Sequence, residues 1–160
     1  MTTTPPPSVL FLCTGNSARS QIAEALLNVR GQGRFVAESA GSHPADRINP
    51  FAVEVLRSVG IDWAGHAPRG FEAIEGRRFD LVITVCDNAR EACPILPGHP
   101  ITAHWGMPDP AAVEGDEYRK REAFRSAFEL IARRVDFLVG LSALSLDRLV
   151  FEEEVQKIGR

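Results

Sequence analysis

The sequence predicts a single α/β domain built on a parallel β-sheet with helices on both faces. Two short apolar runs, Val9–Leu12 and Leu81–Val85, have the length and composition of strands that are buried on both faces. Helical patterns separate these runs, and strands that alternate with helices form parallel sheets. The chain length of 160 residues suits one compact domain.

The expected elements follow one another in a regular order. Asn49 is an expected N-cap, and Pro50 fits the first position of a helix. Gly31 and Gly60 are expected to end the first two helices, whereas residues 61–75 fit no clear pattern. We expect strands at 8–12, 34–38, 81–85 and 101–105, a turn at 39–42, and helices at 17–30, 50–59, 115–140 and 141–160.

The chain divides into three expected segments. Residues 1–7 are rich in threonine and proline and predict a flexible N-terminal tail. Residues 8–140 form the α/β domain, and residues 141–160 form a helical extension of the same domain. The long helix shows a buried face, because apolar residues recur every three or four positions at Phe124, Phe128, Ile131, Val135 and Leu138.

Composition and charge exclude several function classes. Hydrophobic residues make up 44% and charged residues 24% of the chain, which is ordinary for a globular protein. A formal net charge of −3 gives no electrostatic support for nucleic-acid binding. No stretch approaches the roughly 20 apolar residues of a membrane span, and the N-terminus does not resemble a secretory signal. We therefore expect a cytoplasmic protein with no nucleic-acid partner and no membrane partner.

The most informative stretch is the loop between the first strand and the first helix. A helix N-terminus presents unpaired N–H groups and a partial positive charge, which together bind anions. Gly15 and Asn16 tolerate positive φ and allow successive amides to curl around a ligand. Arg19 adds a planar fork that suits a tetrahedral oxyanion. The residues expected to bind the substrate are Thr14, Gly15, Asn16, Ser17, Ala18, Arg19 and Ser20.

Cys13 is the candidate nucleophile of this loop. A thiol beside a helix N-terminus and an arginine has its pKa lowered from about 8.5 to roughly 3.5–7.5 in known cases. We therefore expect a lowered pKa and a reactive thiolate at neutral pH. The alternative is a small buried residue that merely ends a strand, and it does not account for a Gly, an Asn and an Arg within the next six positions.

Cys86 directly follows the predicted strand 81–85. Ligands bind at the carboxyl ends of the strands in parallel sheets, so Cys86 and Cys13 are expected at the same rim. The alternative is that Cys86 and Cys93 are unrelated small hydrophobic residues. The chain has three cysteines, and an odd number in a cytoplasmic protein argues against structural disulfides.

The spacing of Cys86 and Cys93 has a geometric consequence. If residues 87–93 are helical, the two Cα atoms lie about 10 Å apart, whereas a disulfide requires about 7 Å or less. A bridge between them would require this segment to unwind, and Pro94 favours unwinding because it disfavours helical geometry at Cys93. We hypothesise a redox switch that is helical when reduced and looped when oxidised.

Asp109 follows the predicted strand 101–105 and is the candidate general acid. Attack on a tetrahedral oxyanion expels hydroxide or alkoxide, and a positioned carboxylic acid can protonate either leaving group. The alternative is that Asp109 and Pro110 form a plain turn. The four histidines lack the paired spacing of metal ligands and are interpreted as surface or turn residues: His43, His66, His99 and His104.

Residues Val9–Leu27 resemble the phosphate-binding loop region of the low-molecular-weight protein tyrosine phosphatase superfamily. The run Cys-Thr-Gly-Asn-Ser-Ala-Arg-Ser-Gln, starting at Cys13, is most similar to the thioredoxin-coupled arsenate reductases of that superfamily. The resemblance implies a four-stranded parallel sheet in the order 2-1-3-4. It also implies that Arg19 clamps the anion and that Asp109 is the general acid.

The same resemblance implies a relay of three cysteines. Cys13 would attack arsenate, and Cys86 would then attack Cys13 while arsenite leaves. Cys93 would attack Cys86 next, and thioredoxin would reduce the resulting disulfide. No cofactor is required, although a potassium ion bound by Asn16, Glu24 and Ser39 is a further expectation from the resemblance.

Two alternatives remain open at this point. The first is a phosphatase for phosphotyrosine or small phosphate esters, which would use Cys13, Arg19 and Asp109. Such phosphatases usually have aromatic residues after the Asp-Pro pair, whereas this chain has Ala111 and Ala112, which favours a small inorganic substrate. The second is a phosphocysteine carrier of the kind found in sugar-uptake relays, which would need Cys13 but neither Asp109 nor the other cysteines.

Overall fold

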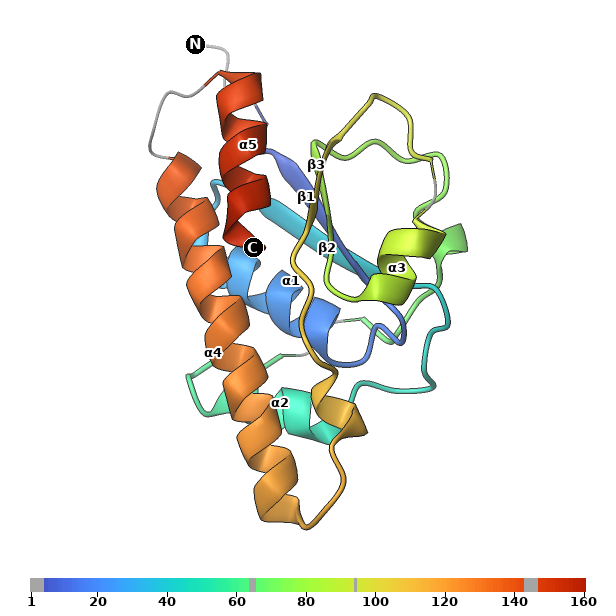
Figure 1. The fold of residues 1–160 in the computed structure, drawn as a ribbon, viewed down its shortest axis with the longest axis vertical. Coiled ribbons are helices and arrows are strands. Elements are labelled where there is room, and N and C mark those ends of the chain that lie inside the picture. The colour runs from blue at the N-terminus through green and yellow to red at the C-terminus, as the bar shows by residue number, and fades with distance from the viewer. Residues whose placement is uncertain (1–4, 64–65, 94, 143–146) are drawn as a thin grey trace.

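The computed structural model describes residues 5–63, 66–93, 95–142 and 147–160. A four-stranded parallel sheet lies at the centre of the fold in the order β2-β1-β3-β4 (Figure 1). This confirms the predicted sheet and its strand order. The strands are β1 (Ser8–Cys13), β2 (Val36–Gly41), β3 (Leu81–Thr84) and β4 (Ile101–His104).

Helices cover the sheet on both sides. Figure 1 shows the long helix α4 and the last helix α5 on one side and the short helix α3 on the other. The helices are α1 (Arg19–Arg30), α2 (Pro50–Arg57), α3 (Asp87–Ala92), α4 (Glu117–Ser142) and α5 (Arg148–Ile158), with 3₁₀ turns η1 (Phe71–Ala73) and η2 (Pro110–Ala112). Among the described residues, none of these helices is long and apolar enough to cross a membrane.

The core lies between the central strands and the helices. The side chains of Val9–Leu12 are fully buried, and every residue of β3 is buried, as the two apolar runs predict. The predicted apolar face of α4 is buried as well, because Phe124, Ile131 and Leu138 are at most 2% exposed. The hypothesised switch requires a helix after Cys86 in the reduced form, and α3 is that helix, although it ends at Ala92 and leaves Cys93 outside; the oxidised loop stays a prediction. The tail residues 1–4 and Pro94 lie outside the described residues.

Strand β2 differs from its predicted position. It spans Val36–Gly41 rather than 34–38, and it pairs in parallel with the whole of β1. The small residues at its end indicated a turn, but they are small because the loop after β1 lies against them. A Cβ atom at Gly41 would lie 2.9 Å from the backbone nitrogen of Asn16. The close approach of two backbones, rather than a turn, explains the glycine.

Several helix boundaries also differ from the prediction: α2 ends at Arg57 rather than at residue 59, and α4 begins at Glu117 rather than at residue 115. Helix α1 begins at Arg19 rather than at residue 17, so Ser17 and Ala18 belong to the loop. The expected extension 141–160 is divided, because α4 continues to Ser142 and α5 begins at Arg148. In contrast, α2 has the predicted cap: Asn49 Oδ1 accepts a hydrogen bond of 2.9 Å from the backbone N–H of Phe51.

Replacing Asn49 with alanine should lower the free energy of unfolding by about 1 kcal/mol, which is typical for loss of an N-cap. The backbone N–H of Asn49 still donates to the carbonyl oxygen of Ser17 at 2.8 Å, so the loop should keep its position. Urea denaturation measures the change. Asn49→Ser keeps a capping oxygen and should retain most of the stability; equal losses in both variants would contradict the assignment.

Candidate active site

The loop from Cys13 to Ser20 is fixed by a neighbouring segment of backbone. The carbonyl oxygens of four loop residues accept hydrogen bonds of 2.8–3.0 Å from backbone N–H groups between residues 42 and 49. Asn16 has a φ of 50°, as its residue type predicts, but Gly15 does not have a positive φ. The prediction for Gly15 is therefore wrong, because Asn16 alone makes the left-handed bend in this loop. The loop is rigidly placed at the carboxyl end of β1.

The Cys13 thiol lies at the bottom of this loop and is 2% exposed. Its Sγ atom lies 2.8 Å from Ser20 Oγ and accepts a hydrogen bond of 3.1 Å from the backbone N–H of Asn16. Burial raises the pKa of Cys13, and this outweighs the lowering by the contacts with Ser20 and Asn16 and by the charge of Arg19. The expected lowered pKa is therefore wrong: the sequence shows the donors of the loop, but it does not show how deeply the sulfur is buried.

Arg19 and Asp109 come together as the sequence predicts. Arg19 is 7% exposed, and its Nη1 atom donates to the carbonyl oxygen of Met107 at 3.1 Å. Its Nη2 atom lies 3.7 Å from Asp109 Oδ2. Asp109 also caps η2, because Oδ1 accepts from the N–H of Ala111 at 2.9 Å. The turn interpretation and the functional interpretation of Asp109 are thus compatible.

Cys86 lies next to the loop that follows Cys13. Its Sγ atom is 3.2 Å from the hydroxyl oxygen of Thr14, the residue after Cys13. It also accepts a hydrogen bond of 3.4 Å from the N–H of Ala89, so Cys86 is the N-cap of α3. A cavity of about 550 Å³ joins these groups, and it is lined by Thr14, Arg19, Cys86, Asp87, Gly106, Met107, Pro108 and Asp109.

Cys93 lies at the opposite end of α3 from Cys86. All three cysteines are in the reduced form. Cys93 is half-buried, and burial raises the pKa of its thiol. It lines a different cavity of about 650 Å³, together with residues of β3, β4 and the end of α5. The structure therefore brings Cys13, Arg19, Cys86 and Asp109 to one site and leaves Cys93 outside it.

The residues expected to bind potassium also lie together. Asn16 Nδ2 donates to Ser39 Oγ at 2.8 Å, and Ser39 Oγ donates to Glu24 Oε1 at 2.7 Å. His66 Nε2 lies 2.8 Å from the same Glu24 oxygen, and Asn16 Oδ1 accepts from the N–H of Arg69 at 3.0 Å. Within the described part of the chain, no buried side-chain oxygen lacks a hydrogen-bond partner. In this arrangement protein donors occupy the Asn16 and Glu24 oxygens, so the potassium ion stays a prediction, and we assign no reaction step to one.

Three residues that support the site were not predicted from the sequence. Gln21 is fully buried, and its Nε2 atom donates to the carbonyl oxygens of Asn16 and His66. His104 links β3 to α3: its Nδ1 lies 2.7 Å from Thr84 Oγ1, and its Nε2 lies 3.0 Å from Asp87 Oδ1. Arg134 reaches the loop after β4 from helix α4. A polar residue on the buried side of a helix was the available signal for Gln21.

Replacing Ser20 with alanine should raise the pKa of Cys13 further, because one lowering hydrogen bond is lost. A thiol with a higher pKa is less ionised at any given pH, so alkylation of Cys13 by iodoacetamide should slow at pH 8. We expect about a tenfold decrease, since a hydrogen bond to a charged group contributes about 1.5–3 kcal/mol and one pKa unit equals about 1.4 kcal/mol.

Peptide mapping by mass spectrometry distinguishes Cys13 from the other cysteines in this experiment. The curve of rate against pH should move to higher pH in Ser20→Ala. Ser17→Ala changes a hydroxyl of the same loop that is not one of the Cys13 contacts described above, and it should leave the curve in place. An identical shift in both variants would mean that Ser20 has no specific effect on the sulfur.

Comparison with known proteins identifies the family. The family model described as "Low molecular weight phosphotyrosine protein phosphatase" matches residues 8–150. An arsenate reductase of Bacillus licheniformis is 38% identical over 128 residues, which cover 80% of this chain and 91% of the relative. An arsenate reductase of Bacillus subtilis is 36% identical over 127 residues, which cover 79% of this chain and 91% of the relative.

The solved structures that resemble this chain include arsenate reductases as well. The arsenate reductase of Archaeoglobus fulgidus has a TM-score of 0.68 at 33% identity and covers 82% of this chain and 98% of its own. A thioredoxin-dependent arsenate reductase of Corynebacterium glutamicum has a TM-score of 0.69 at 31% identity, over 91% of this chain and 66% of its own. With the four-residue site described above, these matches show that the chain belongs to the low molecular weight phosphotyrosine protein phosphatase family, among its arsenate reductases.

Proposed function

We propose that this protein reduces arsenate to arsenite through Cys13, Cys86 and Cys93, in that order. The observation that carries the proposal is the position of Cys86, whose Sγ atom contacts Thr14 beside the nucleophile in the cavity that holds Arg19 and Asp109. A phosphatase has a use for Cys13, Arg19 and Asp109, but it has no use for a second thiol at this point. The relatives named as arsenate reductases support the same assignment.

The first step forms a bond between sulfur and arsenic. Arsenate carries negative charge and suits the N–H groups of the loop and the fork of Arg19. The Cys13 thiolate attacks the arsenic atom, and a hydroxide leaves as water after it takes a proton from Asp109. The contacts of Cys13 Sγ with Ser20 and Asn16 favour the thiolate against the effect of burial.

The second step reduces the arsenic. The Cys86 thiolate attacks Cys13 Sγ, so that a disulfide forms between them and the sulfur–arsenic bond breaks. The electron pair of that bond remains on arsenic, which changes from As(V) to As(III) and leaves as arsenite. Two thiols have then supplied the two electrons.

The third step moves the disulfide away from the nucleophile. Cys93 attacks Cys86 Sγ, a Cys86–Cys93 bridge forms, and Cys13 is released as a thiolate. Cys86 and Cys93 flank the six residues of α3, so their Cα atoms are about 10 Å apart along an intact helix. Since a disulfide needs about 7 Å or less, α3 must unwind for this step.

Thioredoxin is the proposed reductant of the Cys86–Cys93 bridge. The proposal is supported by the C. glutamicum neighbour, which is described as thioredoxin-dependent. Cys93 is nearer the surface than Cys13, and Ile95, two residues further on, is fully exposed. A protein dithiol can approach an exposed loop of this kind, whereas the buried sulfur of Cys13 is inaccessible to it.

A phosphatase activity at the same cavity is the second candidate function. It is favoured by the contact between Arg19 and Asp109, which places an anion clamp next to a proton donor. The tyrosine phosphatase Wzb of Escherichia coli K30, solved with sulphate, has a TM-score of 0.68 at 25% identity and covers 84% of this chain and 97% of its own. A phosphocysteine carrier would not require Asp109 in this position.

Counting thiols after addition of arsenate to the reduced protein, without thioredoxin, tests the relay. In the wild type we expect two thiols to be lost and the bridge to map to Cys86 and Cys93. In Cys93→Ser the bridge should map to Cys13 and Cys86, with one arsenite released per chain. In Cys86→Ser no arsenite should form. Three intact thiols in the wild type would refute arsenate reduction and favour the phosphatase.

Replacing Asp109 with asparagine tests the general acid while keeping an oxygen that can cap η2. General acid–base catalysis contributes about 10²–10⁴-fold, so we expect a decrease of at least about 100-fold in the single-turnover rate of arsenite formation. The affinity for phosphate should change little. Asp116→Asn is the matched control, because Asp116 caps the start of α4 outside the cavity. Full activity in Asp109→Asn would assign proton donation to another group.

A further inference from the structure

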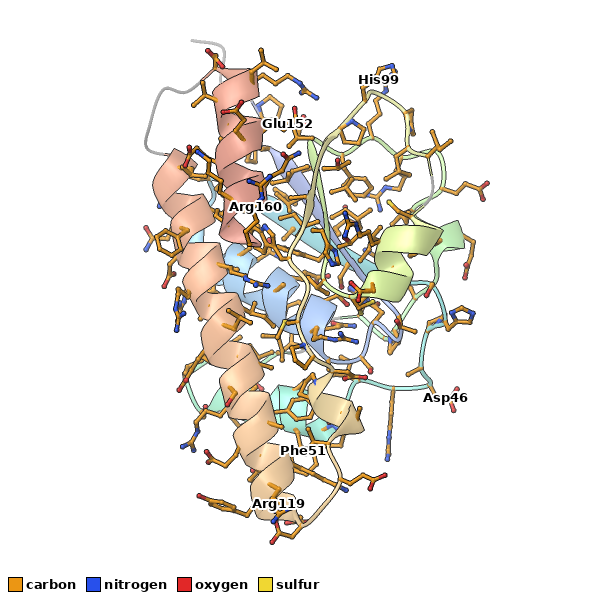
Figure 2. All side chains as sticks on the ribbon, in the orientation of Figure 1. Asp46, Phe51, His99, Arg119, Glu152 and Arg160 are labelled. Atoms are coloured by element: carbon orange, nitrogen blue, oxygen red, sulfur yellow. The ribbon has the colours of Figure 1, made fainter. Side chains whose placement is uncertain are left out.

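Helix α5 lies mostly beyond the part of the chain that the family model matches, which ends at residue 150. It packs against α4 and against β4, the edge strand of the sheet. Arg148 Nη2 donates to the carbonyl oxygen of His99 at 2.6 Å, and Gln156 Nε2 donates to that of Thr102 at 3.1 Å. Figure 2 labels His99, which precedes β4, and Arg160, which follows α5; they mark the two ends of the contact between α5 and β4. The helix therefore follows β4 from one end to the other.

The central contact of α5 is with Trp105, the residue that follows β4. The Trp105 side chain is 1% exposed, and its Nε1 atom donates to the carbonyl oxygen of Val155 at 3.1 Å. That carbonyl belongs to the last turn of α5 and lacks its usual partner, because the N–H of Gly159 donates to the carbonyl oxygen of Gln156 instead. A buried indole donor and a helix-end acceptor thus satisfy each other.

Trp105 also begins the loop that carries Asp109. Its backbone N–H donates to the carbonyl oxygen of Thr84 at 2.7 Å, and its ring packs on Phe11 of β1. Arg134 Nη1 donates to the carbonyl oxygen of Trp105 at 2.8 Å. Only three residues lie between Trp105 and Asp109, so a shift of the indole is transmitted to the carboxylate over a short length of chain.

Gly159 shows how closely α5 approaches this point. A Cβ atom at Gly159 would lie 2.7 Å from Trp105 Cδ1 and closer still to the carbonyl oxygen of His104. Any side chain at this position must therefore move the end of α5 away from β4 and Trp105. The glycine is required by close contact, since its φ of −83° is accessible to any residue.

We propose that α5 positions the acid loop: by holding Trp105 through Val155 and Gly159, the helix sets the place of Asp109 above the Cys13 loop. Val155, Gly159 and Trp105 are positioning residues, and the effect of α5 on the reaction passes through Asp109. The inference rests on the proposed role of Asp109 as proton donor. It adds to that role a segment that lies mostly outside the family match.

Gly159→Ala tests this inference, and Gly140→Ala is the matched control. Gly140 lies near the end of α4, where a Cβ atom would have no neighbour within 4 Å. In Gly159→Ala we expect kcat for arsenate to fall about tenfold, a partial loss of the roughly 10²–10⁴-fold contribution of a general acid, while KM changes less than about twofold. Gly140→Ala should leave both values unchanged, and circular dichroism should show that both variants are folded.

A double-mutant cycle separates positioning from a general structural effect. In the Asp109→Asn background the proton donor is already absent, so Gly159→Ala should cause little further loss of kcat. Equal losses in both backgrounds would overturn the proposal, as would full activity in Gly159→Ala alone.

A measurement without substrate keeps the test independent of arsenate reduction. Hydrogen exchange followed by NMR should become faster at the Trp105 indole N–H and at the amides of Gly106, Met107 and Asp109 in Gly159→Ala. It should not change there in Gly140→Ala. Unchanged exchange at these amides would overturn the positioning role even if the protein reduced arsenate. Faster exchange in a protein that does not reduce arsenate would support it and contradict only the proposed function.

Discussion

The site depends on the hydrogen bonding of one buried sulfur. Cys13 Sγ lies beneath a loop whose carbonyl groups are bound by the segment 42–49, and it contacts Ser20 Oγ and the N–H of Asn16. Burial protects the thiol from solvent and raises its pKa, while these donors and Arg19 act against that rise. The backbone hydrogen bonds of the loop and the close approach of Gly41 to Asn16 hold these donors in place around the sulfur.

The parallel sheet and the grouping of Cys13, Arg19, Cys86 and Asp109 followed from local patterns in the sequence, whereas the strand order was implied by the resemblance to the superfamily. Apolar runs mark buried strands, and each of these residues lies at the end of a strand or within a few residues after it. The raised pKa of Cys13 did not follow, since burial is produced by distant elements that pack over the loop. The end of β2 was misread for a similar reason: Gly41 is explained by the backbone of Asn16, which is remote in sequence.

Polar networks were the other part that sequence reasoning missed. His66 and His104 were interpreted as surface or turn residues, yet each joins two elements next to the site. His66 contacts Glu24 of α1, and His104 connects Thr84 to Asp87 at the start of α3. Such contacts require residues from separate elements to converge within about 3 Å. No periodic pattern in the sequence records that convergence.

The N-cap of α3 has a consequence for the timing of the reaction. The helix has six residues and begins with a hydrogen bond from Ala89 to the sulfur of Cys86, the same atom that attacks Cys13. The N-cap of α3 and the proposed attack on Cys13 therefore use the same sulfur atom. When Cys86 bonds to Cys13, a short helix loses its cap and becomes easier to unwind. In the proposed relay, the chemical step thus prepares the movement that lets Cys93 reach Cys86.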